Sequence, residues 1–245
     1  MPDSALEFNN VSMTFPDGTK ALEEIDLKVA AGEFVAIVGP SGCGKSTILR
    51  LASGLLEPSS GTVTRSDRSL GYVFQDATLL PWRTVNRNID LFLELQGVAR
   101  STMKARSRTA LELVRLGGFE NHLPNQLSGG MRMRASVARS LALEPELFLF
   151  DEPFGALDEI TRQSLNGEIS RLFTDQHFAG LFITHSISEA TFLSTRVLVM
   201  SPRPGRLVAE FSVPFPQPRT DELRFQPDFA SLCGEISAQL KESLS

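Results

Sequence analysis

Residues 39–46, Gly39-Pro40-Ser41-Gly42-Cys43-Gly44-Lys45-Ser46, decide the fold class of this chain, because they fit the phosphate-loop pattern G-x-x-x-x-G-K-S/T. The apolar run 34–38 precedes this stretch, and residues 47–51 follow it at helical spacing. A strand, a glycine loop and a helix in that order form the setting that the motif requires. A glycine-rich turn with a chance Lys-Ser pair is the alternative, and the fixed spacing favours the phosphate loop.

The chemistry of this stretch predicts binding of a nucleoside triphosphate. Glycines let successive backbone N–H groups point at phosphate oxygens, and the following helix adds the positive end of its dipole. Lys45 would reach the β- and γ-phosphates, and the Ser46 hydroxyl would bind Mg²⁺. Cys43 is interpreted as a small residue that the tight loop tolerates, with a reactive thiol as the alternative. The residues expected to bind the nucleotide here are Gly39, Pro40, Ser41, Gly42, Cys43, Gly44, Lys45, Ser46 and Thr47.

An acidic pair at the end of a predicted strand completes the metal site. Residues 147–150 are apolar without interruption, which is typical of a buried parallel strand, and Asp151-Glu152-Pro153 follow. Open α/β sheets bind their ligands at the carboxyl ends of the strands. Asp151 would therefore hold Mg²⁺, directly or through water, and Glu152 would be the base for the attacking water. Acidic residues also end strands for solvation alone, so this assignment depends on the phosphate loop.

A second glycine-opened helix is predicted at Leu127-Ser128-Gly129-Gly130. Ser128 can cap the helix or donate to a phosphate oxygen, and the glycines permit close backbone approach. An ordinary N-cap and turn is the alternative. Together with the phosphate loop, the pattern favours two protein surfaces that close on one nucleotide.

These motifs resemble, in kind and in order, the nucleotide-binding subunits of ATP-binding-cassette (ABC) transporters, from about Leu6 to about Leu207. The family often has Gln at the positions of Met131 and Met133, and it usually has Tyr at the position of Phe15. A Met side chain offers no amide for a hydrogen bond. Leu127-Ser128-Gly129-Gly130-Met131 corresponds to the signature motif of that family. The further motifs of the resemblance are Phe15, Gln75, Ala156-Leu157-Asp158 and His185.

The resemblance implies a head-to-tail pair of cassettes with two ATP molecules at the interface. Each site would take the phosphate loop from one chain and Ser128, Gly129 and Gly130 from the other. Such a pair would close when ATP binds and reopen after hydrolysis and product release.

The resemblance also implies roles for single residues. Phe15 would stack on adenine, and Gln75 would link Mg²⁺ and the attacking water to the helical part of the chain. His185 would contact the γ-phosphate and hold the water and Glu152 in place, whereas a lone His after a strand is otherwise typical of a structural residue. Asp158 would reach across the dimer interface.

Composition narrows the function classes. The chain has 245 residues, a net charge of −5 and a pI near 5.3, so no overall basic field favours nucleic acid. Cys43 and Cys233 lie far apart, and one of them is in the phosphate loop, which argues against a disulfide and suits a reducing cytosol. We expect no signal peptide at residues 1–4 and no membrane span, so a transporter subunit would need membrane partners.

The order of elements predicts an α/β fold: a P-loop NTPase (RecA-like) core, an antiparallel β subdomain and a helical signature subdomain. Strands are expected at 6–15 and 21–29 around the turn Pro16-Asp17-Gly18, and again from 147, 181 and 197. The core with its β subdomain would comprise residues 1–84 and 144–210. The helical subdomain would comprise 85–143, and a C-terminal extension 211–245.

Residues 76–85 bear on the partner. In the family this stretch faces the coupling helix of the membrane subunit, and here Trp82 stands among Leu79, Leu80 and Pro81. An exposed aromatic cluster would suit a helix-in-groove contact, and packing of Trp82 inside the cassette is the alternative. The wording Leu-Leu-Pro-Trp-Arg-Thr-Val, together with residues 200–206, resembles the importer branch for nitrate, sulfonate, taurine and related small anions.

The tail combines an extended stretch with a helix. Residues 202–218 are rich in Pro and are expected to form neither a helix nor a central strand. Five apolar residues then recur at helical spacing and form one face. This helix is expected to fold onto the cassette, with partner binding as the alternative. The five residues are Phe225, Phe229, Leu232, Ile236 and Leu240.

The prediction as a whole is an ATP-hydrolysing importer subunit, peripheral at the cytoplasmic face of the cell membrane, with ATP and Mg²⁺ as cofactors. Its partners would be a second copy in a homodimer, integral membrane permease subunits and, indirectly, an extracytoplasmic solute-binding protein, with no nucleic acid. Two alternatives stay open. A soluble ABC ATPase without a transport role usually carries coiled-coil insertions or two cassettes in one chain, and a P-loop small-molecule kinase would lack the signature.

Overall fold

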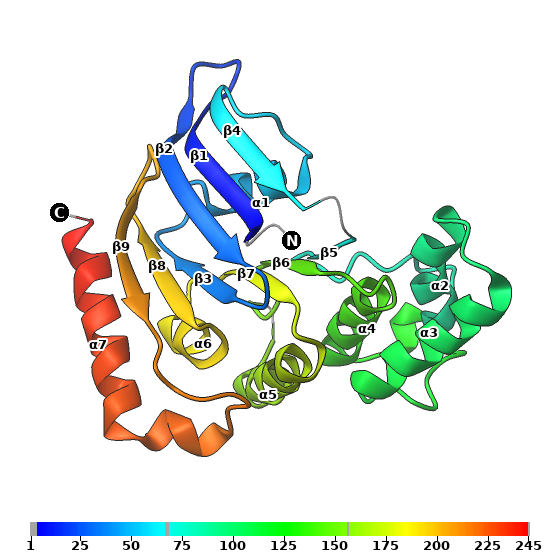
Figure 1. Ribbon diagram of the computed structural model, residues 1–245. Coiled ribbons are helices and arrows are strands. Elements are labelled where there is room, and N and C mark those ends of the chain that lie inside the picture. The colour runs from blue at the N-terminus through cyan, green and yellow to red at the C-terminus, as the bar shows by residue number, and fades with distance from the viewer. Residues whose placement is uncertain (1–3, 67–68, 156, 245) are drawn as a thin grey trace.

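A six-stranded sheet forms the centre of the fold in the computed structural model (Figure 1). Its strands run in the order β5-β6-β7-β3-β8-β9, parallel from β5 to β8, with β9 antiparallel to β8. The structure describes residues 4–66, 69–155 and 157–244, so Ala156 of the predicted motif lies outside the described residues. The bounds are β3 Phe34–Val38, β5 Leu70–Val73, β6 Leu147–Asp151, β7 Ala179–Ile183, β8 Arg196–Met200 and β9 Leu207–Ser212.

A smaller antiparallel sheet, in the order β2-β1-β4, covers one side of the central sheet. Its strands are β1 Ser4–Thr14, β2 Lys20–Ala30 and β4 Ser60–Arg65. The predicted turn joins β1 to β2, where the Asp17 carboxylate accepts a hydrogen bond from the Thr19 N–H at 2.9 Å. Both N-terminal strands that the sequence predicts are therefore confirmed.

Seven α-helices and two short 3₁₀ segments complete the described chain. Helices α2, α3 and α4 pack on one another in the lobe at the right of Figure 1. No helix in the described ranges combines the length and the hydrophobicity that crossing a bilayer requires. The helices are α1 Lys45–Ser53, α2 Val85–Leu95, α3 Arg100–Leu113, α4 Gly129–Leu141, α5 Glu159–Gln176, α6 Ile187–Leu193 and α7 Pro227–Glu242, and the 3₁₀ segments are η1 Pro124–Gln126 and η2 Asp221–Phe225.

The parallel strands are apolar on both faces because both faces are covered. In β3, Phe34, Ala36 and Val38 join a cluster that extends into α2 to α7, whereas Val35 and Ile37 join a second cluster with α1 and the antiparallel sheet. The alternation of side chains along the strand explains this division. It fixes the carboxyl end of β3, and the loop that follows, between two packed layers.

The C-terminal helix packs on α6 and β8, so the predicted docking onto the cassette is confirmed. Phe229 and Ile236 are buried, and Leu232 and Leu240 pack beside them. Phe225 is a correction: it precedes α7 and its side chain is 86% exposed. Pro227 starts the helix two residues later, which takes Phe225 off the helical face.

Strand β9 is an edge strand, and it crosses the boundary predicted after residue 210; the domain division stays a prediction.

Arg219 anchors the start of this extension. Its guanidinium is buried and donates at 2.8 Å to the carbonyls of Thr191, Phe192 and Ser194 at the end of α6. Burial lowers the pKa of Arg219 to about 10. These carbonyls have few other donors once the helix ends.

Replacement of Arg219 by Met should therefore destabilise the protein by about 3 kcal/mol, because buried carbonyls lose their donors. Urea unfolding would measure the change. Arg108→Met is the matched control, because Arg108 forms an exposed ion pair with Glu112 in α3; it should cost less than about 0.5 kcal/mol. Equal losses in the two variants would contradict the anchoring role.

Candidate nucleotide site

The phosphate loop lies between β3 and α1, as the sequence predicts. Gly44 caps α1 with a φ of 108°, and a Cβ there would lie 2.7 Å from Leu22 Cδ2 and 2.9 Å from the Ala21 carbonyl oxygen. Only glycine fits this combination of backbone conformation and close approach. Cys43 is buried, and burial raises the pKa of its thiol. This environment favours a small packing residue over a reactive thiolate.

The Lys45 ammonium is held over the loop. Its Nζ donates to the carbonyl oxygens of Gly39 and Pro40, both at 2.9 Å, and the side chain is 5% exposed. The same Nζ lies 3.9 Å from Glu152 Oε1. A buried cation on a glycine loop is a strong attractor for phosphate, because little solvent screens its charge.

Ser46 and Asp151 form the candidate metal position. The Ser46 hydroxyl donates to Asp151 Oδ1 at 2.9 Å, although the two residues are 105 positions apart. Burial raises the pKa of Asp151, and the Ser46 hydrogen bond opposes this effect. Within the described ranges, no group of three or more His, Cys, Asp or Glu could hold a metal ion. One carboxylate and one hydroxyl fit Mg²⁺, which takes oxygen ligands and completes its shell with phosphate and water.

Glu152 and His185 face each other across the ends of β6 and β7. The His185 Nδ1 lies 3.2 Å from Glu152 Oε2, and the histidine side chain is 58% exposed. Glu152 has a φ of 44°, a strained conformation for a residue with a side chain, and its N–H donates to the Ile183 carbonyl. A Cβ at Gly155 would lie 3.8 Å from His185 Cε1 and 4.0 Å from Gln75 Nε2, which places both side chains beside this turn.

A second group of predicted residues lies on α4 and α5. Ser128 caps α4 and accepts from the Met131 N–H at 3.3 Å; Ser128 and Gly129 are exposed. Gly130 is buried, and a Cβ there would collide with the Thr161 side chain. Asp158 caps α5 and accepts from the Thr161 N–H and hydroxyl at 3.0 and 2.7 Å. The signature segment and the Asp158 loop are therefore direct neighbours.

Two further sequence features find a structural explanation. Met133 is buried in the main core cluster and Met131 packs against it, so both positions serve packing. Phe15 lies half-buried in the turn between β1 and β2, beside the second cluster. Its predicted stacking on adenine stays a prediction.

The family model described as “ABC transporter” matches residues 22–155, which is more than half of the chain. This chain belongs to the ABC transporter family. An ATP-binding protein of Brucella abortus (strain 2308) is 42% identical over 238 residues, covering 94% of this cassette and 91% of that protein. The taurine import ATP-binding protein TauB of Yersinia pestis bv. Antiqua (strain Antiqua) is 42% identical over 207 residues, covering 82% and 81%.

Solved structures agree with this assignment. The bacterial ABC transporter cassette MJ0796, as a dimer and in a post-hydrolysis state bound to ADP and Pi, aligns with a TM-score of 0.75 at 30% identity, covering 86% of this chain and 99% of that one. The cbiO1 protein of Clostridium perfringens, part of the complex cbiONQ, reaches 0.81 over 98% and 97% at 23% identity, which shows the fold. The predicted P-loop fold and ATPase class are confirmed, and the small-molecule kinase alternative is wrong.

Arg203 also contacts the phosphate loop, although the sequence analysis did not assign this residue to the site. Arg203 donates to the Gly42 carbonyl from Nε at 3.1 Å and from Nη2 at 2.8 Å. This contact braces the phosphate loop from the segment after β8. In the sequence, residues 200–206 indicate only a resemblance to an importer branch, and it is the fold that brings positions 42 and 203 together.

Hydrogen bonds of Asn88 fix the loop around Trp82, and the Trp82 side chain is exposed to solvent. The buried Asn88 amide accepts from the Leu80 N–H at 2.7 Å and donates to the carbonyls of Leu80, Arg83 and Thr84. Trp82 itself is 73% exposed, so the alternative of packing inside the cassette is wrong.

Arg139 of α4 holds the preceding part of this loop. It is buried, donates to the Thr78 carbonyl and hydroxyl at 2.9 Å, and lies over the Phe92 ring of α2. The signature helix and the stretch that follows Gln75 are thereby tied together.

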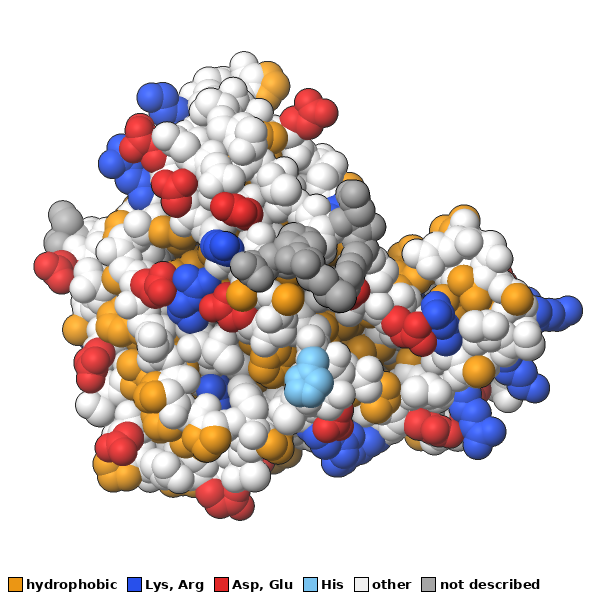
Figure 2. Space-filling model, in the orientation of Figure 1, with side chains coloured by type: hydrophobic (Ala, Val, Ile, Leu, Met, Phe, Trp, Pro, Cys, Tyr) orange, Lys and Arg blue, Asp and Glu red, His pale blue; other side chains and the backbone are white. Residues whose placement is uncertain are grey.

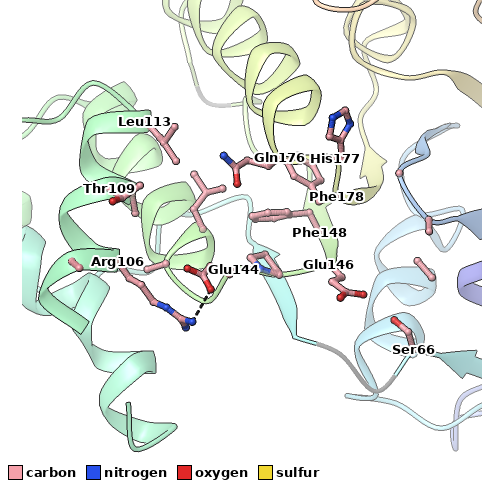
Figure 3. Close-up of a pocket in the computed structure, with 18 of the residues that line it drawn as sticks. Ser66, Arg106, Thr109, Leu113, Glu144, Glu146, Phe148, Gln176, His177 and Phe178 are labelled. Atoms are coloured by element: carbon pink, nitrogen blue, oxygen red, sulfur yellow. Dashed lines mark ion pairs between the residues drawn. The ribbon is translucent and has the colours of Figure 1, made fainter. Parts of the chain in front are cut away.

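A large pocket lies apart from the candidate nucleotide site. A pocket of about 800 Å³ opens between α3, α4 and the amino-terminal ends of β6 and β7 (Figure 3). Phe148 and Phe178 line it, and Arg106 pairs there with Glu144 at 2.6 Å. It holds none of the predicted nucleotide-site residues, which gather at the carboxyl ends of the strands.

On the face that Figure 2 shows, acidic and basic side chains of the described residues are interspersed.

Proposed function

We propose that this ABC ATPase powers an importer for a small anionic solute of the taurine, sulfonate or nitrate kind. Support for the import role comes from the TauB relative, a taurine import ATP-binding protein that shares 42% identity over 82% of this chain. The constellation of Lys45, Glu152 and His185 carries the hydrolytic part of the proposal.

Hydrolysis would proceed on the residues gathered at the strand ends. Lys45 neutralises charge on the β- and γ-phosphates, and Glu152 accepts the proton of the attacking water. His185 holds the Glu152 carboxylate at the distance seen here, and Gln75 orients the water from the same side. Ser46 and Asp151 would hold Mg²⁺, which supplies charge stabilisation for the phosphates when bound.

The active unit would be a head-to-tail homodimer. The exposed Ser128 and Gly129 stand at the N-terminus of α4, and the N-terminal N–H groups of a helix suit an anion. The MJ0796 cassette is a dimer in its solved structure. In this proposal Ser128 of one chain faces the γ-phosphate that Lys45 of the other chain holds, and Asp158 reaches across the dimer interface.

Membrane permease subunits would dock on the loop around Trp82, which places the cassette at the cytoplasmic face of the membrane. Asn88 and Arg139 hold this loop in one shape, so a partner meets a preformed surface and pays little ordering entropy. Large exposed aromatic residues are frequent anchors of protein interfaces. A solute-binding protein would act through the permease.

Trp82→Ala should weaken association with the permease by about tenfold or more and leave the ATPase rate of the isolated cassette within about twofold. Co-purification after co-expression with the permease genes, together with the ATPase rate, would measure both. Leu95→Ala is the matched control, because Leu95 is 75% exposed at the end of α2. Equal loss of association in both variants would rule out a specific role for Trp82.

The import role is tested by uptake of labelled taurine, an alkanesulfonate and nitrate. Cells that lack the gene would receive the wild type, Glu152→Gln or no cassette. Uptake of one of these anions with the wild type alone supports the proposal. ATPase activity without uptake of any of them favours another solute or the alternative of an ABC ATPase without a transport role.

A further inference from the structure

Glu189 is a buried carboxylate beside the site that no step above uses. It lies in α6, four residues after His185, and its side chain is 7% exposed. The Thr184 hydroxyl, immediately before His185, donates to Glu189 Oε2 at 2.5 Å. The loop that carries His185 is therefore tied to Glu189 by its own preceding residue.

The other oxygen of Glu189 faces Arg162 of α5. Arg162 Nε lies 3.4 Å from Glu189 Oε1, and Arg162 Nη2 donates to the Leu157 carbonyl at 2.9 Å. Leu157 directly precedes Asp158. One carboxylate and one guanidinium thus connect the two loops that carry His185 and Asp158.

The C-terminal extension also contacts α6, through Arg224. Arg224 donates to the Ser188 hydroxyl at 2.9 Å and lies 3.9 Å above the Phe192 ring, so it holds α6 on both sides of Glu189. Burial raises the pKa of Glu189, while the Thr184 hydroxyl and Arg162 lower it. Without these partners, Glu189 would be a buried carboxylate with no compensating hydrogen bond or charge, which is destabilising.

We propose that the Glu189–Arg162 pair is a positioning device that sets His185 and Asp158 relative to each other, so that the dimer contact and the water-holding histidine move as a unit. The inference rests on the proposed function, because it takes His185 and Asp158 in their proposed roles. Glu189 acts through Thr184 and Arg162 and touches no reacting atom, so its loss should lower kcat without changing the affinity for ATP.

Glu189→Gln and Arg162→Gln should each lower kcat about tenfold, with KM for ATP within about twofold of the wild type. Because the pair acts as one unit, the double variant should be no slower than the slower single variant. Thr184→Val keeps all charges, removes the hydroxyl donor and should lower kcat in the same way. It keeps the test decisive if Glu189→Gln does not fold.

Glu168→Gln is the matched control. Glu168 is an equally buried carboxylate on α5 that faces Arg115 and Arg134 at 3.9 and 3.8 Å, and burial raises its pKa as well. Its variant should change Tm as much as Glu189→Gln but leave kcat near the wild-type value. Equal changes of kcat in the two variants, additive losses in the double variant, or an unchanged kcat in Glu189→Gln would overturn the positioning role. Hydrolysis that survives Glu152→Gln would instead reject the proposed site.

Discussion

Glu152→Gln should abolish ATP turnover, with a fall in kcat of at least about a hundredfold, and should leave ATP binding intact. The amide keeps the shape and the contact with His185 Nδ1, 3.2 Å away, but it cannot accept a proton from water. Loss of its charge also removes a repulsion of the γ-phosphate, so ATP should bind at least as tightly. The ATP-bound dimer should therefore accumulate.

Phosphate release measures turnover, and size-exclusion chromatography with ATP measures the dimer. Glu144→Gln is the matched control: it precedes β6 at the opposite end of the strand and pairs with Arg106. It should hydrolyse ATP at the wild-type rate. Hydrolysis within a few-fold of the wild type in Glu152→Gln would reject Glu152 as the base.

The central sheet was predictable because burial on both faces leaves a strong mark in sequence. Strands β3, β6, β7 and β8 are runs of apolar residues, and each is buried throughout or nearly so. The two N-terminal strands were predicted from the turn that joins them, whose Asp side chain closes on the backbone two residues later. In these elements the local pattern and the tertiary environment agree.

Part of the site was also predictable, since its chemistry is local. The phosphate loop comprises consecutive residues, and Asp151 and Glu152 end an apolar run. Gln75 and His185 were assigned only by the order of the motifs, because single residues after strands have many explanations. The structure brings both side chains beside the turn at Gly155.

The polar residues that support the site and the loop around Trp82 could not be predicted. Asn88, Arg139 and Glu189 are ordinary residues of helices in the sequence, and their importance comes from partners that are distant in the chain or bonded through the backbone. Phe225 shows the converse error, because a periodic pattern cannot tell which of its members lies before the helix begins. Side chains whose role depends on tertiary contacts leave no periodic signal.

Ser128→Asp should prevent ATP-dependent dimerisation and lower the ATPase rate by about a hundredfold. Asp caps a helix as well as Ser does, and its charge suits the positive end of the α4 dipole, so the fold should lose no stability. The same charge would face the γ-phosphate held by Lys45 of the other chain and would repel it. Binding of ATP to the separate chains should stay within about twofold, because Ser128 and Lys45 belong to different chains of the proposed shared site.

Ser128→Ala separates the cap from the charge. It removes the acceptor for the Met131 N–H and should cost about 1 kcal/mol of stability, yet it places no anion in the interface. Its rate should therefore lie between those of the wild type and Ser128→Asp. Nucleotide titrations, Tm and the dimer fraction distinguish the two variants. A Ser128→Asp protein that dimerises with ATP as the wild type does would show that Ser128 lies away from the γ-phosphate, and the shared site would have to be abandoned.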